Sequence, residues 1–284
     1  MKTAIVMEGG AMRGLFTCGV IDVLMEKKIT FDGAIGVSAG ATFGCNLKSH
    51  QIGRALRYNK RYARDKRLKS FSSWIKTGDL FNVDFCYHEL PFKLDIWDAD
   101  TFAADPMEFY VVATNVETGL PAYHKLTDGC GKDLEWIRAS ASMPLASRPV
   151  SIDGRLYLDG GSSDSIPLGF MEERGYDHLL VVETQPADYI KKPQSYMGLI
   201  KTVYRDYPSF VRTIKDRYIM YNNEKAYIRE REKSGDVLVI RPASPLDISP
   251  MERDTDEFDR VYEEGRKAAL EILSKENWLS ELGI

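Results

Sequence analysis

The chain has 284 residues, of which 44% are hydrophobic and 28% charged, so it holds enough apolar mass for one large domain or two small ones. Its formal net charge of -4 argues against a dedicated nucleic-acid-binding protein, which would usually be basic.

The cysteines and the apolar runs indicate in which cellular compartment the protein is expected. Cys18, Cys45, Cys86 and Cys130 form no CxxC pair, which favours a reducing compartment over a zinc site or a disulfide framework. The first apolar stretch is too short for a signal peptide, and no window approaches the roughly 18 apolar residues of a membrane span. We therefore expect a cytoplasmic protein, with peripheral contact at the inner membrane surface left open.

The first fifty residues alternate between predicted strands and helices. Residues 4–7 form a short apolar run before a glycine turn, and residues 14–28 carry apolar side chains at helical spacing. A second buried strand is predicted at 33–37, followed by a helix over 39–47. This alternation is typical of a parallel sheet with helices on its faces.

The rest of the chain continues in the same way. Strands are predicted at 109–114, 121–126, 155–158, 179–182 and 237–240, and helices at 133–142, 167–174, across most of 196–233, and at 255–274. The expected fold class is α/β, a three-layer α/β/α arrangement with a mainly parallel central sheet and a C-terminal helical extension. Residues 1–185 are expected to form the catalytic core, with residues 186–284 packed on the same domain.

One motif predicts a nucleophile. Gly36-Val37-Ser38-Ala39-Gly40 matches G-x-S-x-G between a strand and a helix. A sharp turn of this kind strains the serine backbone, exposes its hydroxyl, and points free helix N–H groups at developing negative charge. The alternative is an ordinary strand-to-helix turn in which Ser38 is an N-cap.

The base that would activate Ser38 is less obvious. The last third of the chain contains no histidine, so the Ser–acid–His order of the α/β-hydrolases is not available. Asp159 is the best candidate, because it ends a short strand and the glycines Gly160 and Gly161 let the backbone pass close to a site. Desolvation beside the serine would raise the basicity of this carboxylate. Asp-Gly-Gly is also an ordinary turn.

A glycine-rich loop follows the first strand as Glu8-Gly9-Gly10-Ala11-Met12-Arg13-Gly14. Consecutive small residues leave backbone N–H groups accessible, as an oxyanion hole requires. Dinucleotide binding uses a similar loop, but the G-x-G-x-x-G spacing is not met here.

In this order, the three motifs resemble those of the patatin-like phospholipases, which pair D-G-G-G-x-[KR]-G with G-x-S-x-G and D-G-[GA]. The resemblance covers roughly residues 3–185 and implies a patatin-like fold and a lipid acyl hydrolase that needs no metal or cofactor. It implies that Ser38 is the nucleophile and Asp159 the base, with Gly10 and Ala11 forming the oxyanion hole. Two residues depart from the family pattern: Glu8 replaces the usual Asp, and Ala11 replaces the third glycine.

The remaining features leave alternatives open. Eight Lys and Arg residues lie between positions 54 and 69, and four of them, Arg57, Lys60, Arg61 and Arg64, are predicted to fall near one helix face. This segment, around Arg54, Arg57, Arg61 and Arg64, suits either anionic lipid headgroups or plain solvation. Seven aromatic residues between 196 and 227 fit either the wall of an acyl pocket or a helix core. A non-catalytic lipid- or protein-binding relative is the alternative to a phospholipid or lysophospholipid esterase.

Overall fold

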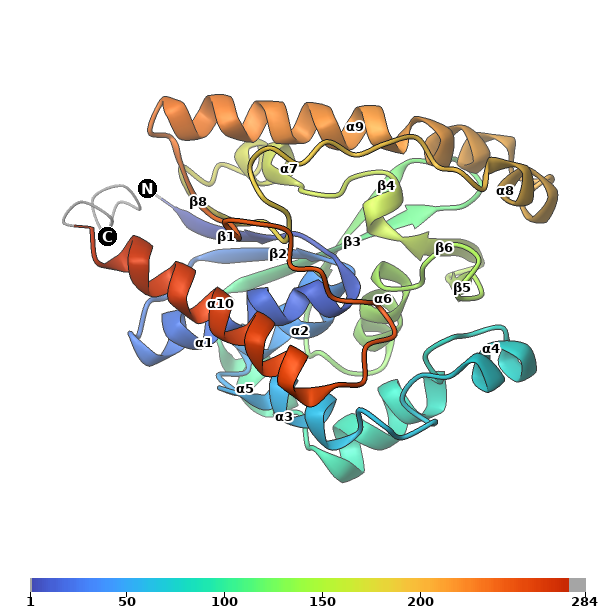
Figure 1. Ribbon diagram of the computed structural model, residues 1–284, viewed down its shortest axis with the longest axis horizontal. Coiled ribbons are helices and arrows are strands. Elements are labelled where there is room, and N and C mark those ends of the chain that lie inside the picture. The colour runs from blue at the N-terminus through green and yellow to red at the C-terminus, as the bar shows by residue number, and fades with distance from the viewer. Residues whose placement is uncertain (1, 276–284) are drawn as a thin grey trace.

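The computed structural model describes residues 2–275 and contains one eight-stranded sheet between layers of helices (Figure 1). The strands are β1 (Thr3–Met7), β2 (Gly33–Val37), β3 (Glu108–Asn115), β4 (Pro121–Leu126), β5 (Val150–Ile152), β6 (Arg155–Asp159), β7 (His178–Val182) and β8 (Val237–Ile240). The α-helices are α1 (Gly14–Glu26), α2 (Ala39–Lys48), α3 (Arg54–Arg61), α4 (Phe71–Thr77), α5 (Ala99–Ala104), α6 (Lys132–Ser140), α7 (Leu168–Glu173), α8 (Met197–Val203), α9 (Pro208–Lys233) and α10 (Thr255–Leu273). Two 3₁₀ turns cover Ala11–Arg13 and Gly160–Ser162, and a π-helix covers Asp84–Leu94.

The sheet order is β5-β6-β3-β2-β1-β7-β8, with β4 paired to β3. Strands β3, β2, β1, β7 and β8 each run parallel to their neighbours in this order. Such parallel pairs need crossover connections, which the helices provide here. Strands β4, β5 and β6 are antiparallel additions at one side. The predicted α/β class with a mainly parallel sheet is confirmed.

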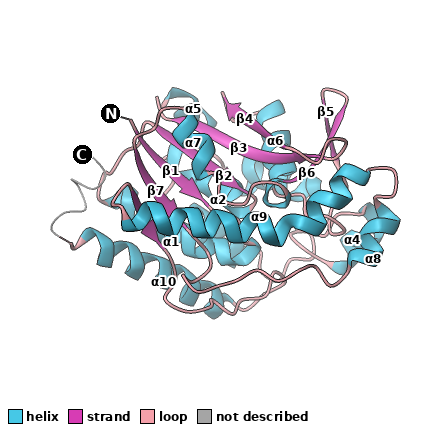
Figure 2. Cartoon of the chain, turned by 90° about the horizontal axis from the view of Figure 1, so that it is seen from above, coloured by secondary structure: helices cyan, strands magenta, loops and turns pink. Residues whose placement is uncertain are grey.

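Alternating side chains of the strands separate two apolar layers. Ile5 and Met7 of β1 pack into the core that includes α1, α2 and α10, whereas Ala4 and Val6 face the core of α7 and α9. All five residues of β1 are buried, as expected for a central strand covered on both faces. Viewed from above, α9 crosses one face of the sheet (Figure 2). The three-layer arrangement is therefore confirmed.

The C-terminal segments lie on both faces of this sheet. β8 extends the sheet in parallel beside β7, and α10 packs against α1 so closely that a Cβ on Gly19 would lie 2.1 Å from the Tyr262 carbonyl oxygen. On the other face, α9 is attached through a buried ion pair of 2.6 Å between Lys225 Nζ and Glu183 Oε2. These contacts support our proposal that residues 186–275 share one domain with residues 2–185; the last nine residues of the predicted segment 186–284 lie outside the described residues.

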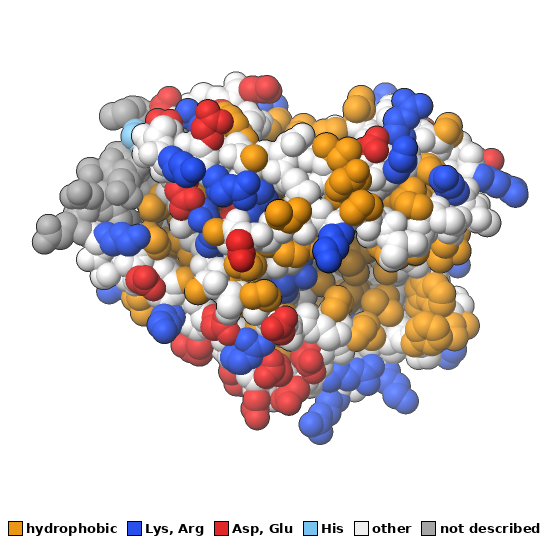
Figure 3. All heavy atoms as spheres, turned by 45° about the horizontal axis from the view of Figure 1, so that its top comes forward, with side chains coloured by type: hydrophobic (Ala, Val, Ile, Leu, Met, Phe, Trp, Pro, Cys, Tyr) orange, Lys and Arg blue, Asp and Glu red, His pale blue; other side chains and the backbone are white. Residues whose placement is uncertain are grey.

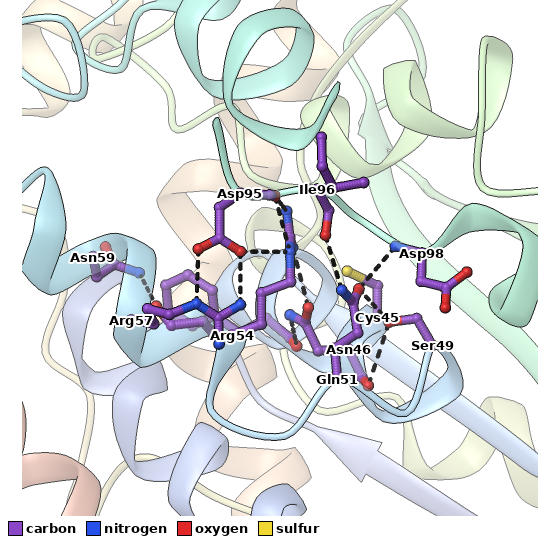
Figure 4. A network of polar contacts seen from close by, with 12 residues as sticks. Cys45, Asn46, Ser49, Gln51, Arg54, Arg57, Asn59, Asp95, Ile96 and Asp98 are labelled. Carbon is purple, nitrogen blue, oxygen red and sulfur yellow. Dashed lines mark hydrogen bonds and ion pairs between the residues drawn. The ribbon is translucent and has the colours of Figure 1, made fainter. Parts of the chain in front are cut away.

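The basic segment differs from its prediction. α3 ends at Arg61, so Arg64 lies beyond the helix and not on its face. Arg54 is buried, where its guanidinium donates to the Asn46 side chain and to the Asp95 carbonyl oxygen (Figure 4). Arg57 stays partly exposed and pairs with the Asp95 carboxylate at 2.8 Å. None of the described helices is both long and apolar enough to cross a membrane.

Candidate active site

Ser38 occupies the sharp turn between β2 and α2. Its backbone has φ 55° and ψ -118°, a conformation that costs a non-glycine residue free energy and that the G-x-S-x-G pattern predicts. Its N–H donates to the buried Ser140 hydroxyl at 3.0 Å, which holds the turn against the end of α6. The turn also requires Gly40, because a Cβ there would lie 2.2 Å from the Met7 carbonyl oxygen.

Asp159 reaches the same level of the sheet from a different strand. β2 pairs with β3 in parallel through Val37 and Val112, and β6 pairs with β3 antiparallel through Asp159 and Ala113. The residue after Val37 therefore meets Asp159 across β3, although 121 positions separate Ser38 from Asp159 in the chain.

The two side chains line the same cavity. The Gly161 N–H donates to Asp159 Oδ1 at 2.8 Å. Burial raises the pKa of Asp159 above its ordinary value, while the Ser38 side chain and the positive charge of Arg217 act in the opposite direction. Asp159 is thus a buried carboxylate whose basicity exceeds that of an ordinary aspartate.

The glycine loop lies directly against Ser38. A Cβ on Gly9 would lie 2.8 Å from Ser38 Cβ, so no other residue fits there without a shift. Ala11 has φ 50°, the left-handed conformation that the third family glycine would adopt more easily. Within residues 2–275, the N–H groups of Gly10 and Ala11 donate to no protein acceptor, which leaves them available to a ligand.

Glu8 anchors this loop. Its Oε2 accepts from the Thr184 N–H at 2.6 Å, and its Oε1 accepts from the Tyr221 hydroxyl at 2.8 Å. The departure from the family's aspartate is therefore accommodated by partners at the end of β7 and on α9.

The other residues of the loop point in different directions. Met12 is buried and lies with Ser38 against an apolar cavity, whereas Arg13 faces a polar cavity.

The remaining glycines allow close packing. Gly14 brings α1 to α2, since a Cβ there would lie 2.7 Å from Ala39 Cβ. Gly36 and Gly160 likewise pack against backbone, and Gly161 lies beside Asp159.

Two cavities meet at Ser38. The first encloses about 150 Å³ and is mainly apolar. Its wall includes Phe43, Cys45, Tyr58, Leu90, Trp97 and Ile137. The second encloses about 470 Å³ and contains Asp159 and the glycine loop. Its wall includes Arg13, Tyr189, Lys191, Arg217 and Tyr221.

Lys191 and Arg217 were not predicted as site residues from the sequence. Lys191 lies in an irregular segment, and Arg217 is one of many charged residues on a long helix, so neither stands in a motif. The aromatic run held a weak signal for this region, because Tyr221 is both a core residue and the partner of Glu8.

Comparison with protein families matches residues 5–171, more than half of the chain, to the patatin-like phospholipases. Residues 207–279, which include α9, β8 and α10, match a domain of unknown function, DUF6363.

Individual relatives are more distant. The uncharacterized protein YjjU of Escherichia coli (strain K12) is 28% identical, over 86% of this chain and 70% of its own length. Lysophospholipase NTE1 of Candida albicans is 25% identical over 98% of this chain, which spans only 20% of that protein. Among solved structures, VipD from Legionella pneumophila covers 95% of this chain and 66% of its own, with 13% identity and a TM-score of 0.49.

Proposed function

This chain belongs to the patatin-like phospholipase family, and we propose that it is a lipid acyl hydrolase acting on phospholipids or lysophospholipids through Ser38 and Asp159. The observation that carries the proposal is that the strained Ser38 and the buried Asp159 carboxylate line one cavity, beside free N–H groups of the glycine loop. The lysophospholipases among its relatives support a lipid ester as substrate.

The proposed reaction proceeds through an acyl-enzyme. Asp159 takes the proton of the Ser38 hydroxyl as its oxygen attacks the ester carbonyl, and the N–H groups of Gly10 and Ala11 hold the resulting oxyanion. When the intermediate collapses, the ester C–O bond breaks and Asp159 returns the proton to the leaving alcohol. Water then loses a proton to Asp159 and attacks the acyl-enzyme, which releases the fatty acid and restores Ser38.

The surface around α4 and α8 suits a lipid substrate. Phe71 and Ile75 on α4 and Leu199 and Val203 on α8 are exposed. Figure 3 shows hydrophobic side chains gathered around a hollow on the side of the molecule where these helices lie, with Lys and Arg side chains nearby. Trp74 of α4 donates to the Leu145 carbonyl oxygen at 2.8 Å, and Leu145 donates its N–H to Tyr204 at 3.1 Å. Leu145 lies between residues that line the cavities at Ser38, so in this proposal substrate enters from this side.

Membrane contact through the basic segment remains part of the proposal in a narrower form. Arg54 is buried, so such contact would involve Arg57, Arg61 and Arg64. All four cysteines are free, which agrees with the proposed cytoplasmic location.

The competing proposal is a non-catalytic relative that binds lipid or protein. Ester hydrolysis by purified protein, together with fluorophosphonate labelling of Ser38, separates the two. We expect Ser38→Ala to abolish both hydrolysis and labelling, and Asp159→Asn to lower kcat by about 10²–10⁴-fold, the usual contribution of a general base. Both variants should keep the wild-type circular dichroism spectrum. Turnover close to wild type in folded Ser38→Ala protein would overturn the mechanism.

A further inference from the structure

Three cationic side chains from separate parts of the chain line the polar cavity beside Ser38. Arg13 comes from the glycine loop, Lys191 from the segment after β7, and Arg217 from α9. We propose that Lys191 and Arg217, with Arg13, bind the phosphate of the substrate's headgroup while the acyl chain lies in the apolar cavity. This inference rests on the proposed function and extends it to the choice of substrate.

Lys191 is held in place by its backbone and by two aromatic rings. Its N–H donates to Asn222 Oδ1 at 2.9 Å, and Asn222 Nδ2 donates to the Lys191 carbonyl oxygen at 3.0 Å. The ammonium lies 4.3 Å from the centre of the Tyr221 ring and 5.8 Å from that of Tyr189. These contacts attach the lysine to α9 without using its three N–H donors.

Arg217 joins the polar cavity to the loop of the proposed base. Its Nε donates to the Gly161 carbonyl oxygen, and its positive charge acts to lower the pKa of Asp159. A guanidinium has five N–H donors, so most of them remain for an anion. Arg13 adds a buried Nε that has no hydrogen-bond partner among the described residues.

The acidic side chains of the cavity offset these cations only in part. Among the described residues, only Glu8 and Asp159 contribute carboxylates to its wall. Glu8 acts on Lys191 across the cavity, and Lys191 and Arg217 act on Asp159. None of the three cations forms an ion pair in the described part of the chain. Three cations against two wall carboxylates leave a net positive charge in a partly buried cavity, which favours an anionic ligand.

A phosphate ester is the anion that fits this position. In a lysophospholipid the glycerol backbone alone separates the acyl ester from the phosphate, so a phosphate in the polar cavity leaves the ester at Ser38. Arginine binds phosphate oxygens through its planar fork and lysine as a point charge. Because α9 carries both Arg217 and Asn222, the segment matched to a domain of unknown function acquires a role in headgroup recognition.

Two esters with the same octanoyl chain test this inference: lysophosphatidylglycerol and monoacylglycerol. The readout is the ratio of their kcat/KM values, since any effect of Lys191 on the pKa of Asp159 alters both values and cancels. We expect Lys191→Gln to lower this ratio about tenfold to a hundredfold, the usual effect of losing a hydrogen bond to a charged group. Lys191→Arg should retain most of it, and the exposed neighbour variant Lys192→Gln should leave it unchanged.

A binding measurement identifies the source of the phosphate without relying on turnover. Calorimetry on Ser38→Ala protein should detect sn-glycerol 3-phosphate, with weaker binding after Lys191→Gln is added. Equal affinity for inorganic phosphate would assign the cavity to free phosphate and overturn the headgroup assignment. An unchanged ester ratio in Lys191→Gln would overturn it as well. If the wild type cleaves neither ester but glycerol phosphate still binds through Lys191, the proposed function fails while the phosphate site stands.

Discussion

The two cavities at Ser38 differ in both origin and chemistry. The apolar cavity is built by residues 11–147 of the family-matched core, whereas all the cationic and aromatic residues of the polar cavity's wall except Arg13 come from beyond residue 185. Apolar contact is non-directional and grows with buried area, so it selects a chain by length. Charged contact depends on where each donor lies, so it selects a headgroup by chemistry. Chain-length selection and headgroup selection at Ser38 can therefore be changed separately, each through its own cavity.

Narrowing the apolar cavity should give the largest effect, because it should change chain-length selection and leave headgroup selection as it is. Cys45 lies two turns along α2 from Ser38, near the buried Arg54, and Cys45→Phe fills this end of the cavity. Each methylene that no longer enters loses about 0.8 kcal/mol, or about fourfold in kcat/KM, so excluding three costs about 60-fold. A series of esters of increasing chain length measures this, and the headgroup ratio should not change.

The matched control is Cys45→Ala, which removes atoms from the same wall and should not shorten the accepted chain. Equal losses for short and long chains in folded Cys45→Phe protein would mean that the acyl chain lies elsewhere.

Between pH 7 and 9, kcat/KM should fall by about tenfold for the phosphate ester relative to monoacylglycerol. Burial lowers the pKa of Lys191 to about 8, with Arg217 and Arg13 acting in the same direction and Glu8 and Glu224 opposing them. As pH rises from 7 to 9 the lysine loses its charge, so kcat/KM should fall for the phosphate ester alone. Both substrates should share an acid limb, because Asp159 must be ionised to act as a base and its pKa is raised.

Rate profiles from pH 4 to 10 on both esters provide the measurement. Loss of the alkaline limb in Lys191→Gln assigns it to this residue. An alkaline limb of equal size on monoacylglycerol would contradict the assignment.

The smallest effect is expected at the anchor of the glycine loop, because this loop borders both cavities through Ala11. Tyr221→Phe removes the hydroxyl that donates to Glu8 Oε1 and leaves that buried oxygen without this partner. We expect about 1 kcal/mol of lost loop positioning, or about fivefold in kcat/KM, equally for both esters. Tyr227→Phe is the control, because Tyr227 lies on an exposed part of α9 and its hydroxyl donates to Glu172 of α7. A change in the headgroup ratio with Tyr221→Phe would mean that Tyr221 acts mainly by holding Lys191.

The parts of the site that the sequence predicted are those with a local physical signal. A buried strand followed by Gly-x-Ser-x-Gly indicates a sharp turn before a helix, and the structure has Ser38 at φ 55° in that place. Asp159 and the loop at Gly9 were found in the same way, since each follows a strand and lies beside glycines. Their proximity was an expectation from the family resemblance, because no local pattern contains a contact between residues 38 and 159.

Arg54 illustrates what local pattern could not predict. Its sequence neighbours are basic, which favoured a solvated or lipid-facing role, but Asn46 and Asp95 make it a buried residue. Asp95 follows a π-helix that contains Pro91. Because proline usually interrupts a helix, the sequence did not indicate a continuous helix there.

By itself, the sequence determined seven of the eight strands, the long helices, the strained turn at Ser38 and the glycine loop, because these follow from side-chain periodicity and from backbone conformations available to glycine. The short β5, α4 and α5 and the π-helix were not predicted. Only the tertiary structure decided that Arg13, Lys191 and Arg217 share one cavity with Asp159. Those residues are brought together by strand register and by the packing of α9 across the sheet, and such long-range contacts depend on the whole fold and not on any short stretch of chain.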